Sequence, residues 1–490
     1  MRAVSDSNKS GKVNKTSTPD ADVKLLRLND FLFTSGLDNI NLFKVLRYCK
    51  RSEISKKLNG FVDRFFDHHL LPDSAQVGQG QADGSGRGQG VGVASGDDKQ
   101  MRSPLMIIES FLSALTSADK DGRIVVTKSA TVTLSRLKFL LLNPAVHFSP
   151  ILHECRAVVV TGGTMQPVSE FKDQLLYSVG VSPSRVIEFS CGHVIPADHL
   201  LPVALSRGPS GVTFDFTYQT RDTTALMDEL GRAILNLCNV VPGGVVCFFP
   251  SYEYEKRIYT HWTTTGCLDK INSKKKVFRE PKMASQVETI LTQYSRCIEF
   301  NGGGGGGGVG GLSGALLLSV VGGKLSEGIN FSDDMGRCVV MVGLPYPNIK
   351  SPELAEKMRY LNSTLPRDPD GKLPGQIHYE NLCMKAVNQS IGRSIRHARD
   401  YACIVLADQR YSRPSVRSKL PQWISSQLVV CESFGPAFSS LRKVSCPWLQ
   451  LYIDFYIPPF PHSSSMRKRK KLKMFHQINC TIISTLFPCP

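Results

Sequence analysis

The feature that most constrains the fold of this 490-residue chain is an alternation of short, continuous apolar runs with longer amphipathic stretches. Apolar runs without polar interruption are typical of parallel strands that are buried on both faces. The runs predict strands at 123–127, 156–161, 186–189, 212–217, 244–249, 315–321, 337–343 and 402–407. Apolar residues at helical spacing predict helices between the later strands, at 224–239, 283–298 and 378–396. This order indicates a doubly wound α/β fold.

Composition narrows the class of protein. Lys and Arg number 59 against 42 Asp and Glu, a net charge of +17. This excess favours a polyanionic partner, nucleic acid or nucleotide, although a basic surface without a specific partner remains the alternative. The 14 cysteines form no CxxC pair, which indicates reduced thiols in an intracellular protein and predicts no metal site. No apolar run reaches the ~18 residues of a membrane-spanning helix, and the N-terminus resembles no secretory signal.

Polar, glycine-containing segments adjoin four of the expected strands, where open α/β sheets bind their ligands. Three of them follow a strand: Gly162–Thr164, Pro250–Tyr252 and Gly322–Phe331. The fourth, Gln389–His397, precedes the strand at 402–407. The Gly322-Gly323-Lys324 sequence is no phosphate loop, because GxxxxGK[ST] requires four spacer residues and occurs nowhere in the chain.

The fourth segment is the most specific. Gln389, Arg393 and Arg396 are spaced i, i+4 and i+7, which predicts one helical face. Two guanidinium groups one turn apart can contact a triphosphate during phosphoryl transfer, and a solvated basic face is the alternative. Gly392 costs about 1 kcal/mol relative to Ala inside a helix, which suggests close approach of a ligand or a second domain.

These segments resemble, in order, helicase motifs III, IV, V and VI. The sequences are VVVTGGTMQP, GGVVCFFPSYEY, GGKLSEGINF and QSIGRSIRH. The pattern is similar to that of the XPD-like helicases, the iron–sulfur DEAH-box branch of superfamily 2, over roughly residues 25–440. The closest resemblance is to its ChlR-type, sister-chromatid-cohesion members, through LNDFLFTSGLDNINLFKVLRYC, FSCGHVIPADHLLP and ENLCMKAVNQSIGR.

The resemblance implies roles for individual residues. Arg393 and Arg396 would be catalytic arginine fingers on the ATP phosphates. Gln389, Gly392, Glu327 and Gly328 would border ATP. Residues that would bind DNA or couple the motor domains are Thr161, Gly162, Gly163, Thr164, Ser251, Tyr252, Lys324 and Ser326. Asn330 departs from the Asp common in the family.

The resemblance also implies a domain order. Residues 1–71 would be a polar N-terminus and the end of an arch-like helical region, and 72–100 a Gly-rich linker. Residues 101–168 would be the remnant of motor domain one, and 169–440 a complete RecA-like motor domain two with a Gly-rich loop at 302–314. An irregular basic tail, 441–490, would follow.

The expected function is that of the C-terminal half of an ATP-dependent, 5′-to-3′ DNA helicase. The family uses ATP with magnesium, a DEAH box and a four-Cys iron–sulfur cluster, whose motifs this chain lacks. We therefore expect the chain by itself to be inactive and free of iron. The alternative is a catalytically dead nucleic-acid-binding or scaffold fragment.

The tail carries a basic run that has its own interpretations. Its members are Arg467, Lys468, Arg469, Lys470, Lys471 and Lys473. Such a run can be a nuclear-import signal or a phosphate-binding patch, or it can be simply solvated. Together with the resemblance, the run suggests a nuclear protein that does not bind a membrane. Its expected partners are DNA, as single strand and fork, ATP, and replication and cohesion proteins.

Overall fold

The computed structural model describes residues 22–58, 104–117, 120–190, 192–193, 195–302, 312–325, 331–442 and 481–486. They form two compact units. Unit 1 comprises Met1–Asn143 with Lys350–Lys357, and unit 2 comprises Pro144–Ile349 with Met358–Pro490. The linker expected at 72–100 and most of the loop expected at 302–314 lie outside the described residues. The domain boundaries implied by the resemblance stay a prediction.

Unit 1 is built on an antiparallel sheet of order β1-β2-β3. Its strands are β1 (Asp22–Arg27), β2 (Gly122–Lys128) and β3 (Arg136–Leu141), and its helices are α1 (Leu28–Thr34), α2 (Leu42–Ser52) and α4 (Pro104–Ser117). The core joins Phe31, Leu42, Leu115 and Ile124. The Lys350–Lys357 segment contains the start of α11 (Pro352–Thr364), where Glu356 pairs with Arg123 of β2 at 2.7 Å.

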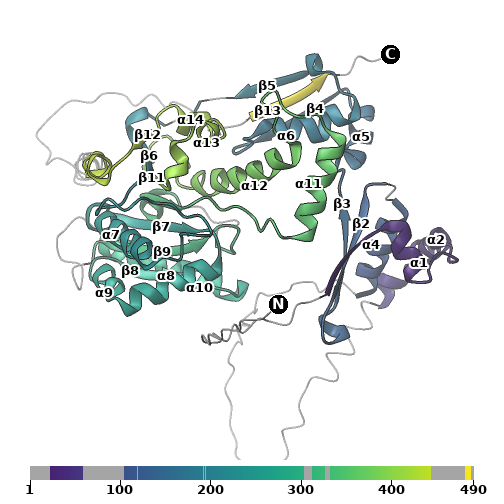
Figure 1. Ribbon diagram of the computed structural model, residues 1–490, viewed down its shortest axis with the longest axis horizontal. Helices are drawn as coiled ribbons and strands as arrows, with labels where there is room; N and C mark the ends of the chain where they lie inside the picture. Colours follow the sequence, from purple (N-terminus) through teal and green to yellow (C-terminus); the bar gives the residue numbers. More distant parts are fainter. Residues whose placement is uncertain are drawn as a thin grey trace, which may run out of the picture. The chain divides into compact units, whose positions relative to one another are not determined.

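Unit 2 contains a seven-stranded sheet in which every neighbouring pair is parallel, of order β12-β6-β11-β10-β7-β9-β8 (Figure 1). Its strands are β6 (Leu200–Leu205), β7 (Gly243–Phe249), β8 (Lys276–Arg279), β9 (Gly314–Val320), β10 (Cys338–Val342), β11 (Ala402–Ala407) and β12 (Val429–Cys431). Every residue of β7, β9, β10 and β11 is buried, as the continuous apolar runs predicted.

Helices cover both faces of this sheet, which confirms the doubly wound α/β fold. Alternate residues of a strand enter opposite cores, so that Val245 belongs to one cluster and Val246 to the other. The first cluster includes α7 (Thr224–Val240), α8 (Tyr252–Thr264) and α9 (Cys267–Asn272), and the second includes α10 (Val287–Gly302), α12 (Pro374–Ile391) and α14 (Gln422–Ser425). A short helix, α13 (Pro414–Arg417), precedes α14.

A second sheet of unit 2 has the order β4-β13-β5 and is antiparallel. Its strands are β4 (Ala157–Gly162), β5 (Val186–Ser190) and β13 (Thr481–Leu486), the last from the tail. The helices α5 (Ala145–Glu154) and α6 (Val168–Phe171) pack beside it, with Leu152 and Val168 in their common core. The expectation that the 156–161 run lies in a parallel sheet buried on both faces is wrong, because Val159 is 60% exposed.

The strand expected at 212–217 is absent. The segment forms one isolated bridge, Arg207 to Thr213, and its Phe214 is fully buried under the sheet. The apolar pattern therefore reported burial correctly but not strand pairing. Within the described residues, no helix is both long and apolar enough to cross a bilayer.

The central strands predict where the fold is most sensitive. Leu317→Ala in β9 removes a fully buried side chain, and we expect it to lower the free energy of unfolding by about 2–5 kcal/mol in urea denaturation. Leu373→Ala, at a side chain that is 39% exposed in the same unit, is the matched control and should cost clearly less. Equal costs would contradict the assigned core.

Candidate functional site

The segments after β7 and β9 meet at one edge of the parallel sheet. Ser251 is the N-cap of α8 and accepts a hydrogen bond from the Tyr254 N–H at 3.2 Å, so that Tyr252 opens the helix. Lys324, exposed, follows β9. Because β7 and β9 are parallel neighbours, their carboxyl ends bring Tyr252 and the Lys324 loop together.

Glu280 fixes this edge. Its buried carboxylate, just beyond β8, accepts hydrogen bonds from Ser319 Oγ at 2.6 Å and from the Val320 and Leu325 N–H groups at 2.8 Å each. The Tyr252 hydroxyl donates to the same carboxylate at 3.3 Å. A Cβ at Gly323 would lie 2.1 Å from Glu280 Oε1, so only glycine fits there. Sequence reasoning missed Glu280, because no strand was expected at 276–279 and its partners are about 40 positions away in the sequence.

A cavity of about 340 Å³ lies at this edge and joins three of the segments. Its lining includes Pro250 after β7, Gly322 after β9, and Gln389 of α12. Tyr346, which follows β10, also lines it and stacks on Tyr379 with ring centroids 4.9 Å apart. Aromatic and backbone polar groups in one hollow suit a planar, polar ligand.

The helical face expected for Gln389, Arg393 and Arg396 is wrong. Helix α12 ends at Ile391, with Gly392 as its C-cap, and both arginines lie in the following loop. The Ser394 hydroxyl donates to the Ile391 carbonyl at 2.8 Å, which stabilises the helix end. A Cβ at Gly392 would lie 2.9 Å from Thr164 Cγ2, so the close approach expected at this glycine comes from the segment after β4.

Asp400 organises the loop that carries the arginines. Its carboxylate, 1% exposed, accepts from Arg337 Nη1 at 2.9 Å and from the Tyr401, Arg396 and Asp333 N–H groups at 2.9, 3.3 and 3.4 Å. The Arg337 guanidinium lies 3.7 Å from the Tyr401 ring centroid. The Phe331 N–H donates to the Arg393 carbonyl at 3.2 Å. Asp400 therefore fixes the Arg393–Arg396 backbone, a role that sequence reasoning missed.

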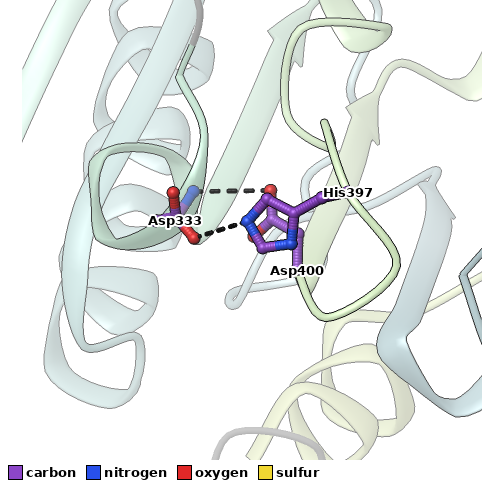
Figure 2. A group of neighbouring side chains, drawn as sticks. All are labelled: Asp333, His397 and Asp400. Atoms are coloured by element: carbon purple, nitrogen blue, oxygen red, sulfur yellow. Dashed lines mark hydrogen bonds and ion pairs between the residues drawn. The ribbon is translucent and has the colours of Figure 1, made fainter. Parts of the chain in front are cut away.

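Asp333, His397 and Asp400 form a group whose potential ligand atoms lie within 4.8 Å of one another (Figure 2). His397 Nε2 lies 2.9 Å from Asp333 Oδ1, and Asp333 adopts a left-handed backbone with φ of 56°. A cation here would face the Arg337 guanidinium, which already binds the Asp400 carboxylate. These contacts are typical of a His–carboxylate pair that connects two loops, and they are less typical of a metal site.

The connections of α12 extend to the segment that follows β4. Glu170 of α6 pairs with His378 at 2.7 Å and Lys385 at 2.9 Å, both on α12. The Asn388 amide donates to the Gln166 carbonyl at 3.2 Å. Burial alone would raise the pKa of Glu170, but the His378 hydrogen bond and the Lys385 charge lower it to about 2. Thr161 and Gly162 end β4, and Gly163 and Thr164 follow it. Because Thr164 lies against Gly392, the end of α12 is close to the first of the four segments.

The four segments do not meet at one edge. The Arg393–Arg396 loop leads into the amino end of β11, whereas Tyr252 and Lys324 follow carboxyl ends. The Gly162–Thr164 segment follows a strand of the other sheet. Ser326, Glu327, Gly328 and Asn330 lie outside the described residues, as does the basic run at 467–473.

Comparison with known proteins finds relatives of this chain among the DNA helicases. The family described as helicase C-terminal domain matches residues 234–427. ATP-dependent DNA helicase DDX11 of Danio rerio is 55% identical over 448 residues, which cover 89% of this chain and 50% of the relative. The mouse (Mus musculus) DDX11 is 54% identical and chl1 of Aspergillus clavatus 37% identical, over 86% and 87% of this chain. A solved XPD helicase covers 66% of this chain and 50% of its own, with a TM-score of 0.41 and 15% identity.

Residues 234–427 therefore match a helicase C-terminal domain, and the chain is similar to ATP-dependent DNA helicases. Its relatives include the DDX11 and chl1 helicases, the ChlR type expected from the sequence. The chain spans about half the length of the curated relatives that it matches.

The Glu170 contacts predict a pH dependence of stability. A carboxyl group whose pKa falls from 4.5 to about 2 on folding stabilises the folded state above pH 4.5, and this stabilisation is lost as the pH falls toward 2. The loss is on the order of 3 kcal/mol. We expect Glu170→Gln to flatten urea stability between pH 5 and pH 2, with the buried-core variant Leu317→Ala as a control that keeps the slope. An unchanged slope in Glu170→Gln would contradict the assignment.

Proposed function

We propose that this chain forms the second motor domain of an ATP-dependent DNA helicase of the ChlR type. The observation that carries the proposal is the loop fixed by Asp400, which holds Arg393 and Arg396 beside the end of α12. The match of residues 234–427 to a helicase C-terminal domain and the ATP-dependent DNA helicase names of its relatives support it. Direction 5′-to-3′ and a role in replication, repair and chromatid cohesion are part of the proposal.

ATP hydrolysis transfers the terminal phosphoryl group to water, and negative charge on its oxygens must be stabilised. Arg393 and Arg396 supply guanidinium groups for this purpose, with Arg396 exposed and Arg393 half-buried. Gln389 and Gly392 shape the adjacent surface, and Glu327 and Gly328 border the nucleotide. Magnesium accompanies the ATP as its counter-ion.

The DNA strand would follow the carboxyl edge of β7 and β9. Ser251, Tyr252, Lys324 and Ser326 are the contacts proposed there, because hydroxyl and ammonium groups bind phosphates and an aromatic ring can meet a base. Glu280 is a positioning residue, since it binds Tyr252 and the backbone on both sides of Lys324 in one network. Thr161, Gly162, Gly163 and Thr164 would transmit movement through α12, which touches Thr164 at Gly392.

Three of the described cysteines do not suit the iron–sulfur cluster that the resemblance implies. The thiols of Cys247, Cys338 and Cys403 are buried in the sheet, and burial raises their pKa values, which opposes the thiolate form that binds iron. No step of the proposed function passes through a cluster in this chain. A nuclear location, directed by the basic run at 467–473, completes the proposal.

Arginine variants test the ATP role. In the ATP-hydrolysing protein that contains this chain, Arg393→Ala or Arg396→Ala should lower DNA-stimulated kcat about 10³-fold, because the charge on the transferred phosphoryl group loses a guanidinium. Arg399→Ala, exposed in the same loop, should change kcat less than about twofold and serves as the matched control. Phosphate release gives the rates. Comparable losses in all three variants would refute specific roles for Arg393 and Arg396.

Lysine variants test the DNA edge. We expect Lys324→Gln to weaken binding of this chain to labelled single-stranded DNA and to reduce the slope of log K against log salt by about 0.7, the value for one phosphate contact. Lys282→Gln, also exposed and just beyond β8, should leave the slope unchanged. Fluorescence anisotropy over a salt series measures both. Identical slopes for Lys324→Gln and the parent chain would remove Lys324 from the DNA path.

A further inference from the structure

We propose that the exposed side of α2 in unit 1 binds single-stranded DNA as a second contact, separate from the motor sheet. We call this surface the basic–aromatic face, formed by Phe43, Lys44, Arg47, Tyr48, Lys50 and Arg51. The choice of DNA rests on the function proposed above. The surface itself follows from the helix alone.

Helical geometry gathers these residues. Asn41 caps α2 by accepting from the Lys44 N–H at 3.0 Å, which sets the start of the helix. Phe43, Arg47 and Lys50 are spaced i, i+4 and i+7, and so are Lys44, Tyr48 and Arg51. The two rows are adjacent on the helix surface, while Leu42 and Leu46 turn inward and are buried.

The surface is basic and aromatic together. Phe43 is 64% exposed and Tyr48 is 62% exposed. Four cations surround the two rings, and α2 contains no acidic residue. The first acid beyond the helix, Glu53, pairs with Lys56 at 3.2 Å. Rings left in water among positive charges have no role in the core, and this combination is the one that single-stranded nucleic acid binds.

Competing ligands fit less well. In duplex DNA the base faces are stacked and closed to an aromatic side chain, whereas single-stranded bases can stack on Phe43 and Tyr48. A membrane surface would require the apolar side of the helix, but Leu42 and Leu46 are already packed in unit 1. An acidic protein segment would match the positive charge, but it has no bases to stack on the Phe43 and Tyr48 rings.

A cavity of about 530 Å³ between α2 and α4 continues the surface. Lys50 and Lys56 line it, opposite Ser110 and Ser113 of α4. Glu53 and Glu109 also line this cavity, and the Ser110 hydroxyl already donates to the Met106 carbonyl at 2.8 Å. The phosphate contacts are therefore assigned to the exposed cations of α2 and not to the cavity.

The test measures binding of this chain to fluorescein-labelled dT20 by anisotropy. The double variant Phe43→Ala/Tyr48→Ala should weaken binding about fivefold or more, because one base stack is lost at each ring. The matched control is Phe33→Ala, which removes a ring that is 69% exposed on α1, a helix without basic residues. Its affinity should be unchanged.

The charge variant Lys44→Gln/Arg47→Gln/Lys50→Gln/Arg51→Gln should reduce the salt slope by about 2–3, near 0.7 for each phosphate contact. Thermal unfolding followed by circular dichroism checks that each variant is folded. Unchanged dT20 affinity in the folded aromatic variant overturns the proposal. So does an equal loss on blunt duplex DNA, or an equal loss on poly-glutamate, which would indicate an acidic protein partner.

The Lys324 variant at the carboxyl edge of β7 and β9 distinguishes this proposal from the proposed function. If Lys324→Gln leaves binding intact while the α2 variants weaken it, the basic–aromatic face stands and the proposed DNA path over the sheet fails. If only Lys324→Gln weakens binding, the face is excluded and the proposed function is retained.

Discussion

The geometry of the arginine loop depends on the buried ion pair between Asp400 and Arg337. Removing two charges from water is costly, and such a pair is tolerated only when further hydrogen bonds satisfy it. Here three backbone N–H groups share the carboxylate, and the Arg337 guanidinium also bonds the Tyr401 carbonyl and lies over its ring. Arg337 directly precedes β10, and Asp400 lies two residues before β11. The two strands therefore hold the ion pair in place, and the ion pair holds the backbone at Arg396.

Helix α12 connects parts of unit 2 that are far apart in sequence. At the end of α12, Gly392 leaves room for the Thr164 side chain. Along the helix, His378 and Lys385 form ion pairs with Glu170. Gln389 opens on the cavity at the carboxyl edge. A shift of α12 would therefore change the surroundings of the arginine loop and of the segment after β4 together.

The sequence was most informative where burial alone decides structure. The apolar runs at 244–249 and 337–343 became central strands because both faces of the sheet are covered. The run at 156–161 has the same pattern, but it pairs antiparallel with β13 and leaves Val159 exposed, which no local pattern reports. The motif spacing placed Arg393 and Arg396 on a helix, but it extended that helix too far because it did not treat Gly392 as a C-cap. Glu280 and Asp400 act through contacts distant in sequence and could not be found by spacing.

Unit 1 is assembled from distant segments, and this sets the order in which the chain can complete it. Arg123 and its partner Glu356 are 233 positions apart, with five of the seven strands of the parallel sheet encoded between them. A ribosome that adds 5–20 residues each second needs on the order of 10–50 s to cover that interval. Throughout that time β2 has emerged without Glu356, so strands β6, β7, β8, β9 and β10 are synthesised before this ion pair can form. Closure of unit 1 is thus completed long after β2 has been synthesised.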